Sequence, residues 1–227
     1  MSKSTKPKNK LLAALPIKAF QPLRPKFERI DLHVGDRLYD PGDDFTHVYF
    51  VESGIIAMLV IADQDSTLQC CMVGSEGMVG LPVFFGIKTA ANRAVVQCPG
   101  TALRMKTTDF RNECADGDGW SSMMHQFAYK TLTQISLTAA CNRFHGLDGR
   151  LARWLLMTRH RLGSDEFNIT QEFMSYMLGV RREAISKAAG SFQDRSLIRY
   201  SRGNFSILDP KGLEAIACNC YQFFVTP

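Results

Sequence analysis

A short stretch of the chain combines a basic face with a single acid. The stretch reads "GVRREAISKAAGSFQDRSLIRY" and begins at Gly179. Its polar positions at helical steps are Arg181, Arg182, Glu183, Ser186 and Lys187. Positions three and four apart lie on one face of a helix, and several of the residues between them here are apolar. The basic side chains indicate an anionic partner, but Glu183 would weaken a grip on polyanions in general.

The chemistry of the DNA major groove accounts for this combination. Arg and Lys pair there with guanine, and a carboxylate accepts a hydrogen bond from the amino group of cytosine. A basic helix with one acid at its entrance is therefore better suited to reading base sequence than to binding phosphate alone. Glu183 has a second interpretation, because the helix dipole stabilises any acid in a first turn. The residue alone does not decide between the two, and the surrounding pattern favours base reading.

The flanking residues predict the elements that would position this helix. "NITQEFMSYMLG" predicts a short helix capped by Thr170, and two short helices joined through Gly179 are typical of a helix-turn-helix. "LIRYSRGNFSILD" predicts two short strands around a turn, which is a wing. The side chains expected to contact the DNA backbone are Thr170, Arg150, Arg153, Arg199 and Arg202.

The charge of the chain is concentrated in this region. Ten Lys and Arg residues and five acids lie between Arg150 and Asn204, and this excess equals the net charge of +5 for all 227 residues. A basic block in one domain is suited to a polyanion. A solvated basic surface explains the charge alone equally well.

Residues 27–105 predict an antiparallel β structure. "TLQCCMV" alternates with a period of two, and glycines and prolines punctuate the stretch at short intervals. "HVYFVESGIIAMLVIA" reads as two strands joined by a hairpin turn at 52–54. Short strands at this spacing favour a compact barrel or roll.

A long helix follows from about Asp118 to His145, since 120–144 holds neither Pro nor Gly. Such a helix would be about 37 Å long, more than a small roll can cover. Its apolar stripe is either core or a dimer seam, and its length favours a seam. The residues expected in that seam are Phe127, Leu132, Ile135 and Ala139.

The remaining features mostly exclude functions. The seven cysteines match no zinc or disulfide framework, so we expect small apolar residues in a reducing cytosol, with no metal site and no cofactor. The role of Cys218 and Cys220, a C-x-C pair that could sense redox state or bind a metal, stays open. No apolar run is long enough to span a membrane, and no motif of an enzyme active site appears.

The segment "ITQEFMSYMLGVRREAISKAAGSFQDRSLIRYSRGNFSILD" resembles the winged helix-turn-helix of the Crp-Fnr bacterial transcription regulators. "GDRLYDPGDDFTHVYFVESGIIAML" is similar to the opening of their cyclic-nucleotide-binding β-roll. The resemblance implies an α+β fold in four segments, in a cytoplasmic protein. These are a basic tail with a short helix (1–26), a β-roll sensor domain (27–117), a dimerisation helix (118–145) and a winged helix-turn-helix (146–227).

The resemblance also implies roles for particular residues. Arg182, Glu183 and Lys187 stand at the family's base-reading positions, although the family usually has Arg where Lys187 stands. Ser186 matches a polar reader of the Fnr-like branch. The effector pocket would be formed by Gly80, Leu81, Asn92, Arg93 and Ala94.

The pocket departs from the family pattern. Leu81 replaces the Glu that holds a ribose hydroxyl, and Asn92 stands where the family's phosphate-binding Arg is expected. Because Arg93 comes one position later, its side chain would turn to the other face of a strand. The family's oxygen sensors hold their cluster on N-terminal cysteines, and the first cysteine here is Cys70. Cyclic AMP and an iron–sulfur cluster are therefore not expected.

These observations predict a homodimeric regulator that binds an inverted-repeat DNA site. Its partners would be double-stranded DNA, a second copy, a small-molecule effector and, for an activator, RNA polymerase. The alternative is a module that senses a cyclic nucleotide or another small ligand and acts on a protein partner.

Overall fold

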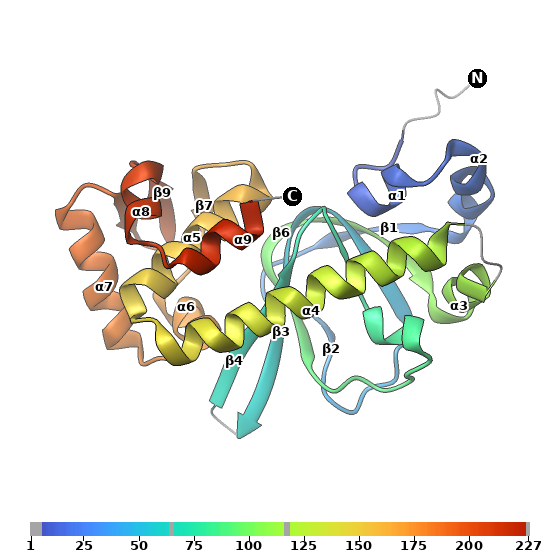
Figure 1. Ribbon diagram of the computed structural model, residues 1–227, viewed down its shortest axis with the longest axis horizontal. Helices are drawn as coiled ribbons and strands as arrows, with labels where there is room; N and C mark the ends of the chain where they lie inside the picture. Colours follow the sequence, from blue (N-terminus) through green and yellow to red (C-terminus); the bar gives the residue numbers. More distant parts are fainter. Residues whose placement is uncertain (1–5, 64–65, 116–118, 226–227) are drawn as a thin grey trace. The chain divides into compact units, whose positions relative to one another are not determined.

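The computed structural model describes residues 6–63, 66–115 and 119–225. The chain forms two compact units (Figure 1). One comprises Met1–Met58 and Met72–Thr131, and the other comprises Leu59–Cys71 and Leu132–Pro227. The second unit thus includes the end of a β-hairpin and half of the long helix, which the predicted segments assign elsewhere.

A six-stranded sheet confirms the predicted antiparallel roll. Its main strand order is β1-β6-β3-β4, while β2 pairs with β6 and β5 pairs with β3. The strands are β1 (Glu28–Leu32), β2 (Arg37–Tyr39), β3 (His47–Asp63), β4 (Ser66–Val73), β5 (Met78–Val79) and β6 (Arg93–Lys106). A short 3-10 helix, η2 (Leu81–Phe85), connects β5 to β6.

The hairpin turn predicted at 52–54 is wrong, because β3 runs through these residues without a break. Gly54 has a φ of 84°, and a Cβ there would lie 2.6 Å from the carbonyl oxygen of Cys98. A Cβ on Gly100 of β6 would lie closer still to the carbonyl oxygen of Ser53. The glycines therefore mark a close approach of two neighbouring strands, which is the other common meaning of a glycine within a strand.

The N-terminal segment, predicted as a basic tail with a short helix, contains short helices and is packed from Asn9 onward. After residues 1–5, which lie outside the described part, come α1 (Lys10–Ala14), α2 (Ile17–Phe20) and η1 (Gln21–Lys26). Asn9 is fully buried, and its side-chain amide donates to the carbonyl oxygens of Val51 and Gly77, each at 2.8 Å. Its Oδ1 accepts from the backbone N–H of Leu12 at 3.1 Å and so caps α1.

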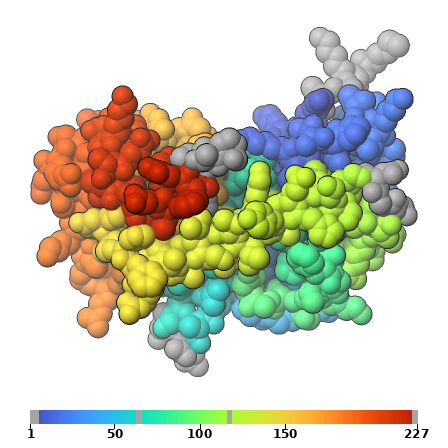
Figure 2. Space-filling view, in the orientation of Figure 1, coloured from blue at the N-terminus to red at the C-terminus, as the bar shows by residue number. Residues whose placement is uncertain are grey.

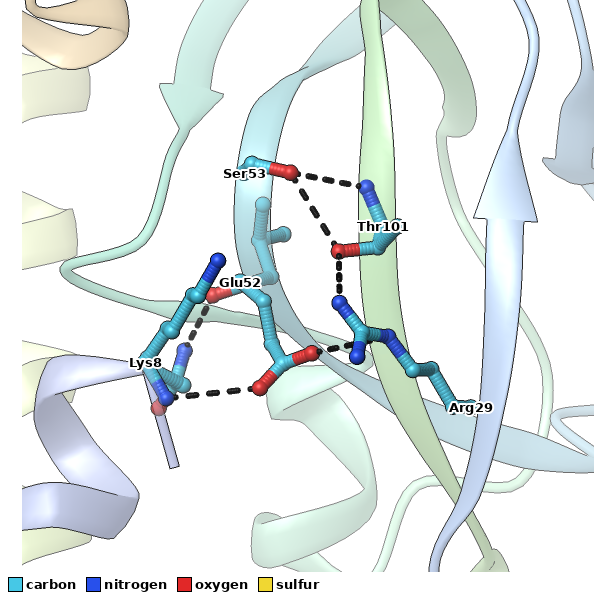
Figure 3. A network of polar contacts seen from close by, with 7 residues as sticks. Lys8, Arg29, Glu52, Ser53 and Thr101 are labelled. Atoms are coloured by element: carbon cyan, nitrogen blue, oxygen red, sulfur yellow. Dashed lines mark hydrogen bonds and ion pairs between the residues drawn. The ribbon is translucent and has the colours of Figure 1, made fainter. Parts of the chain in front are cut away.

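An ion pair between Glu52 and Arg29 adds to the contacts that bind the N-terminal segment to the roll (Figure 3). The backbone N–H of Lys8 donates to Glu52 at 3.3 Å, and the other carboxylate oxygen of Glu52 lies 3.3 Å from Nε of Arg29. Arg29 then donates to the hydroxyl of Thr101, which pairs with Ser53. Side chains from β1, β3 and β6 therefore hold the start of the chain against the roll.

Two helices complete the first unit. They are α3 (Thr107–Ala115) and the long helix α4 (Trp120–Phe144), whose first half belongs here. The expected start at Asp118 lies outside the described residues. Trp120 packs edge-on against Phe50 and Phe110, which fills the space between helix and sheet.

The second unit contains a small three-stranded sheet, of order β7-β9-β8, and several short helices. In chain order its elements after α4 are α5 (Leu147–Leu162), β7 (Glu166–Asn168), α6 (Gln171–Leu178), α7 (Arg182–Asp194), β8 (Ile198–Ser201), β9 (Asn204–Ile207), α8 (Pro210–Ile216), η3 (Asn219–Tyr221) and α9 (Gln222–Val225). The end of the β3–β4 hairpin packs here, since the indole N–H of Trp154 donates to Gln69 at 2.6 Å.

The described residues contain no helix that is both long and apolar enough to cross a lipid bilayer.

Candidate nucleic-acid interface

The turn between α6 and α7 has the geometry that the sequence predicts. The hydroxyl of Thr170 accepts from the backbone N–H of Phe173 at 3.1 Å and caps the start of α6. Gly179 ends α6 with a φ of 61°, and the N–H of Val180 returns to the carbonyl of Ser175 at 3.1 Å. This left-handed position favours glycine, so the chain can turn directly into α7.

A steric prediction follows from this turn. A Cβ on Gly179 would lie 2.9 Å from Leu68, in addition to the backbone strain. We expect Gly179→Ala to lower the free energy of unfolding by about 1–2 kcal/mol. The matched control is Gly190→Ala within α7, where the space is open, and there alanine should stabilise by about 0.5–1 kcal/mol. Thermal unfolding of both variants checks the pair, and equal shifts would contradict this account of the turn.

Helix α7 has one buried face and one exposed face. The buried side chains are Ile185, Ala188, Ala189 and Phe192. The side chains predicted to read bases are all exposed: Arg181, Arg182, Glu183, Ser186 and Lys187. Among the described residues, the four charged side chains of this set form no ion pair, so their charges face solvent. The exposed face can therefore offer both donors and an acceptor to a ligand.

The wing also matches its prediction. Strands β8 and β9 pair around a tight turn, with Arg202 at a φ of 50° and Gly203 at 87°. Arg199 and Arg202 are exposed, so both are accessible to a phosphate backbone. Strand β7, which the sequence did not indicate, adds a third strand through its pairing with β9.

Two of the expected phosphate contacts are placed differently. Arg150 is half-buried and donates to the carbonyl oxygen of Leu178 at the end of α6, and burial lowers the pKa of its guanidinium. Arg153 is only 7% exposed. Both lie on α5, so the hydrogen bond of Arg150 ties α5 to the end of α6, and Arg153 is not accessible to DNA.

The predicted effector residues belong to two segments: Gly80 and Leu81 stand at the start of η2, and Asn92, Arg93 and Ala94 stand at the start of β6. Gly80 precedes η2 with a φ of 95°, Leu81 is its first residue, and Ala94 is fully buried. Arg93 forms an ion pair with Asp40. The one cation of this group is therefore already neutralised by a carboxylate of the same unit.

Helix α4 does not present all four predicted seam residues on one side. Phe127 is buried, and its ring packs so closely on Gly77 that a Cβ there would lie 2.6 Å away. Leu132 is 62% exposed and Ile135 is 37% exposed, and Ala139 is also exposed. Five residues turn a helix by about 500°, so Phe127 and Leu132 point in different directions. The exposed apolar stripe consists of Leu132, Ile135 and Ala139.

A group of cysteine and histidine side chains was only partly visible in the sequence, which singled out Cys218 and Cys220 but neither Cys141 nor His145. Cys141, His145, Cys218 and Cys220 lie with their ligand atoms within 4.8 Å of one another. The available signal was Cys141 and His145, four residues apart and therefore on one face of α4. Nothing in the sequence indicated that the C-x-C pair, more than seventy residues later, would lie beside them.

Comparison with known proteins relates this geometry to a family. A model of the cyclic nucleotide-binding domain matches residues 29–116, and a model of the Crp-like helix-turn-helix domain matches residues 149–216. The chain belongs to the Crp-Fnr family. This Crp-Fnr protein is a DNA-binding transcription regulator with both domains, and its family is not one of enzymes.

Relatives of this Crp-Fnr regulator share its length and its fold. A CRP-like cAMP-activated global transcriptional regulator of Mycobacterium tuberculosis is 23% identical over 202 residues, covering 86% of this chain and 90% of that protein. The structure of FixK2 from Bradyrhizobium japonicum has a TM-score of 0.73 at 11% identity, covering 85% of this chain and 98% of that one. CLP, the c-di-GMP-responsive global regulator of Xanthomonas campestris, has a TM-score of 0.70 at 15% identity, covering 85% and 99%. These structures confirm the predicted fold class.

Proposed function

We propose that the chain acts as a homodimer that recognises an inverted-repeat DNA sequence through α7. The observation that supports this most directly is the composition of the exposed face of α7. Arg182 and Lys187 offer donors for guanine, and Glu183 offers an acceptor for cytosine. Opposite this face, Ile185 and Phe192 are fully buried, which fixes the helix on its support. A helix held in this way can keep its polar side chains in register with base edges.

The wing supplies the contacts that set affinity. Arg199 is exposed on β8 and Arg202 is exposed in the turn between β8 and β9, where each can neutralise a phosphate. Each such contact should contribute about 0.9 to the dependence of log affinity on log salt concentration. Thr170 is the N-cap of α6, and the start of a helix favours a negatively charged group, so we expect a further phosphate contact there.

The exposed stripe of α4 supplies the dimer seam. Leu132 and Ile135 are large apolar side chains in contact with solvent in a single chain. A second copy packed along this stripe would remove them from water. Two copies of α7 would then occupy major grooves about 34 Å apart, which is one turn of B-DNA. If the protein activates transcription, RNA polymerase would be its further partner.

The β-roll is proposed to respond to something other than a cyclic nucleotide. Arg93 is paired with Asp40, and Asp40 also lies 3.5 Å from Arg37. A cyclic phosphate would have to displace Asp40, and Leu81 offers no acceptor to the ribose. The family match at residues 29–116 is therefore a match of domain type, which leaves the ligand unassigned.

Titration calorimetry tests this part of the proposal. We expect no saturable heat when cyclic AMP or cyclic GMP is added to the chain at micromolar concentrations. The control is a titration of the same sample with duplex DNA, which shows that the protein is folded and active. Saturable binding of either nucleotide would contradict the proposal and would favour the alternative, a ligand sensor acting on a protein partner.

The proposal as a whole is tested by selecting bound duplexes from a random pool. A sequence-specific regulator typically binds its site 10³–10⁷ times more tightly than other DNA at physiological salt. Equal binding of the chain to all duplexes would contradict the proposal that it is a sequence-specific regulator.

A further inference from the structure

Four side chains from two distant segments converge at the end of α4. Cys141 and His145 lie one helical turn apart at its C-terminal end. Cys218 caps the short helix η3, and Cys220 lies within it. The Sγ atoms of Cys141 and Cys218 are 3.4 Å apart, and Sγ of Cys220 is 3.7 Å from Nδ1 of His145. Cys141 and Cys220 are buried.

The backbone brings the second segment close to the first. The N–H of Cys218 lies 3.5 Å from the carbonyl oxygen of Gly149 on α5, and the N–H of Tyr221 donates to Cys218 at 2.9 Å. Gly149 therefore lies in van der Waals range of the C-x-C segment. The position of the C-x-C pair is thus defined by the main chain as well as by side-chain packing.

We propose that these four residues bind one Zn²⁺ ion as a Cys₃His site. Zinc in proteins is bound tetrahedrally, with bonds of about 2.3 Å to sulfur and 2.0–2.1 Å to histidine nitrogen. Ligand atoms around such an ion stand about 3.5–3.8 Å apart. The two measured separations, 3.4 and 3.7 Å, and the upper limit of 4.8 Å agree with this spacing after small side-chain rotations. Four protein ligands close the coordination sphere, which is typical of structural zinc.

The spacing favours a single ion over the other uses of cysteine. An iron–sulfur cluster places its own iron and sulfide atoms between the cysteines, so their Sγ atoms would have to stand farther apart than the limit of 4.8 Å allows. A disulfide between Cys141 and Cys218 would require their sulfurs to close from 3.4 Å to about 2.05 Å. It would also leave Cys220 and His145 in contact without a shared role.

The charge around the group supports an occupied site. Zn²⁺ binds thiolates, so the ion would release the three thiol protons to solvent. Three thiolates, a neutral imidazole and Zn²⁺ carry one net negative charge. Burial raises the pKa of the Cys141 and Cys220 thiols, and the positive charge of Arg153, which is only 7% exposed on α5, acts in the opposite direction. This buried cation would balance the charge of the loaded site.

One of the four residues borders a pocket. The pocket has a volume of about 250 Å³, and Cys218 is part of its lining together with Glu214, Ala217, Asn219, Tyr221 and Gln222. Once bound, zinc would join the end of α4 to the segment after α8, and Figure 2 shows the red C-terminal segment lying against the yellow part of the chain. The N–H of Cys218 also lies 3.5 Å from the carbonyl oxygen of Gly149 near the start of α5. The site would therefore stabilise the support of the helix-turn-helix within its own unit, whether or not DNA is bound.

The zinc content of the full-length chain tests the proposal. After zinc loading in a reducing buffer and gel filtration, we expect about one zinc per chain by elemental analysis. Cys218→Ser and Cys220→Ser should each lose most of this zinc. The matched control is Cys114→Ser, which removes a partly exposed cysteine from α3 in the other unit and should leave the zinc in place. Cobalt(II) in place of zinc should show thiolate charge-transfer absorption and the visible bands of a tetrahedral ion.

Thermal unfolding distinguishes loss of the ion from loss of the fold. A chelator should lower the melting temperature of the wild-type chain, because the ion binds the folded state preferentially. The same chelator should leave the melting temperature of Cys218→Ser unchanged. Each of the following would overturn the proposal: no zinc uptake by the reduced wild-type chain, full zinc content in both serine variants, or an iron–sulfur chromophore in place of zinc after anaerobic purification. A Cys141–Cys218 disulfide that persists under mild reduction and excludes zinc would also overturn it.

Discussion

Replacing Ile135 with aspartate should convert the dimer into a monomer and abolish tight binding to an inverted repeat. Ile135 lies in the exposed apolar stripe of α4 with Leu132 and Ala139. In a dimer it would be enclosed by the second copy, and a carboxylate there would be buried without a partner. A monomer engages one half-site at a time, so its affinity for the full repeat should fall on the order of 10²–10⁴-fold. Light scattering and fluorescence anisotropy measure the two effects.

Gln126→Asp is the matched control for this variant. Gln126 is exposed on the same helix, and nine residues turn it away from Ile135 by a half-turn. The control introduces the same negative charge and should stay dimeric. An Ile135→Asp chain that remains a dimer would show that the seam lies elsewhere.

Removing the guanidinium of Arg182 should cost about 1–3 kcal/mol on the cognate site and relax the preference at one base pair. The reason is that a groove contact with guanine stabilises only the correct base. Glu183→Ala should loosen discrimination at a neighbouring position while leaving binding to unrelated DNA nearly unchanged. Competition binding with duplexes changed at one base pair at a time measures both. Equal tightening on every sequence after Glu183→Ala would leave Glu183 as an ordinary first-turn acid.

Arg199→Ala and Arg202→Ala serve as controls for base reading. Their side chains are exposed on the wing, where a phosphate contact carries no sequence information. Each should weaken binding to all sequences by a similar factor and reduce the salt slope by about 1. A change of base preference in either variant would contradict the division of roles between α7 and the wing.

The fold was readable from the sequence wherever one local rule decided it. Alternation with a period of two identified β4, and Thr170 and Gly179 marked the ends of α6. The hairpin turn at 52–54 was predicted wrongly. A glycine that turns a hairpin and a glycine that permits two strands to approach closely look alike in sequence. Only the neighbouring strand, almost fifty residues later, distinguishes them.

Burial was harder to predict than secondary structure. Phe127 and Leu132 belong to one apolar pattern, yet one packs on Gly77 and the other faces solvent. Arg150 looked like a phosphate contact because its charge suits one, but it donates to the end of α6. The side of a helix that becomes buried depends on the partner that packs against it, and sequence periodicity does not name that partner.

The group formed by Cys141, His145, Cys218 and Cys220 could be predicted least of all, because sequence patterns do not show which distant segments pack together. Cys141 and His145 are separated from Cys218 and Cys220 by the whole helix-turn-helix and wing. Ligands drawn from two segments this far apart do not form a short motif, so spacing rules for zinc sites fail to find them. The residues predicted to read bases, in contrast, all lie within seven consecutive positions at the start of α7.

The central claim is that two copies of α7 read base sequence in neighbouring major grooves. Selection of bound duplexes from a random pool, at physiological ionic strength and with or without candidate small molecules, tests it most directly. The account predicts enrichment of an inverted repeat whose half-sites are centred about 10 base pairs apart or at a multiple of that distance. A pool that shows no enriched sequence under any of these conditions would contradict the claim.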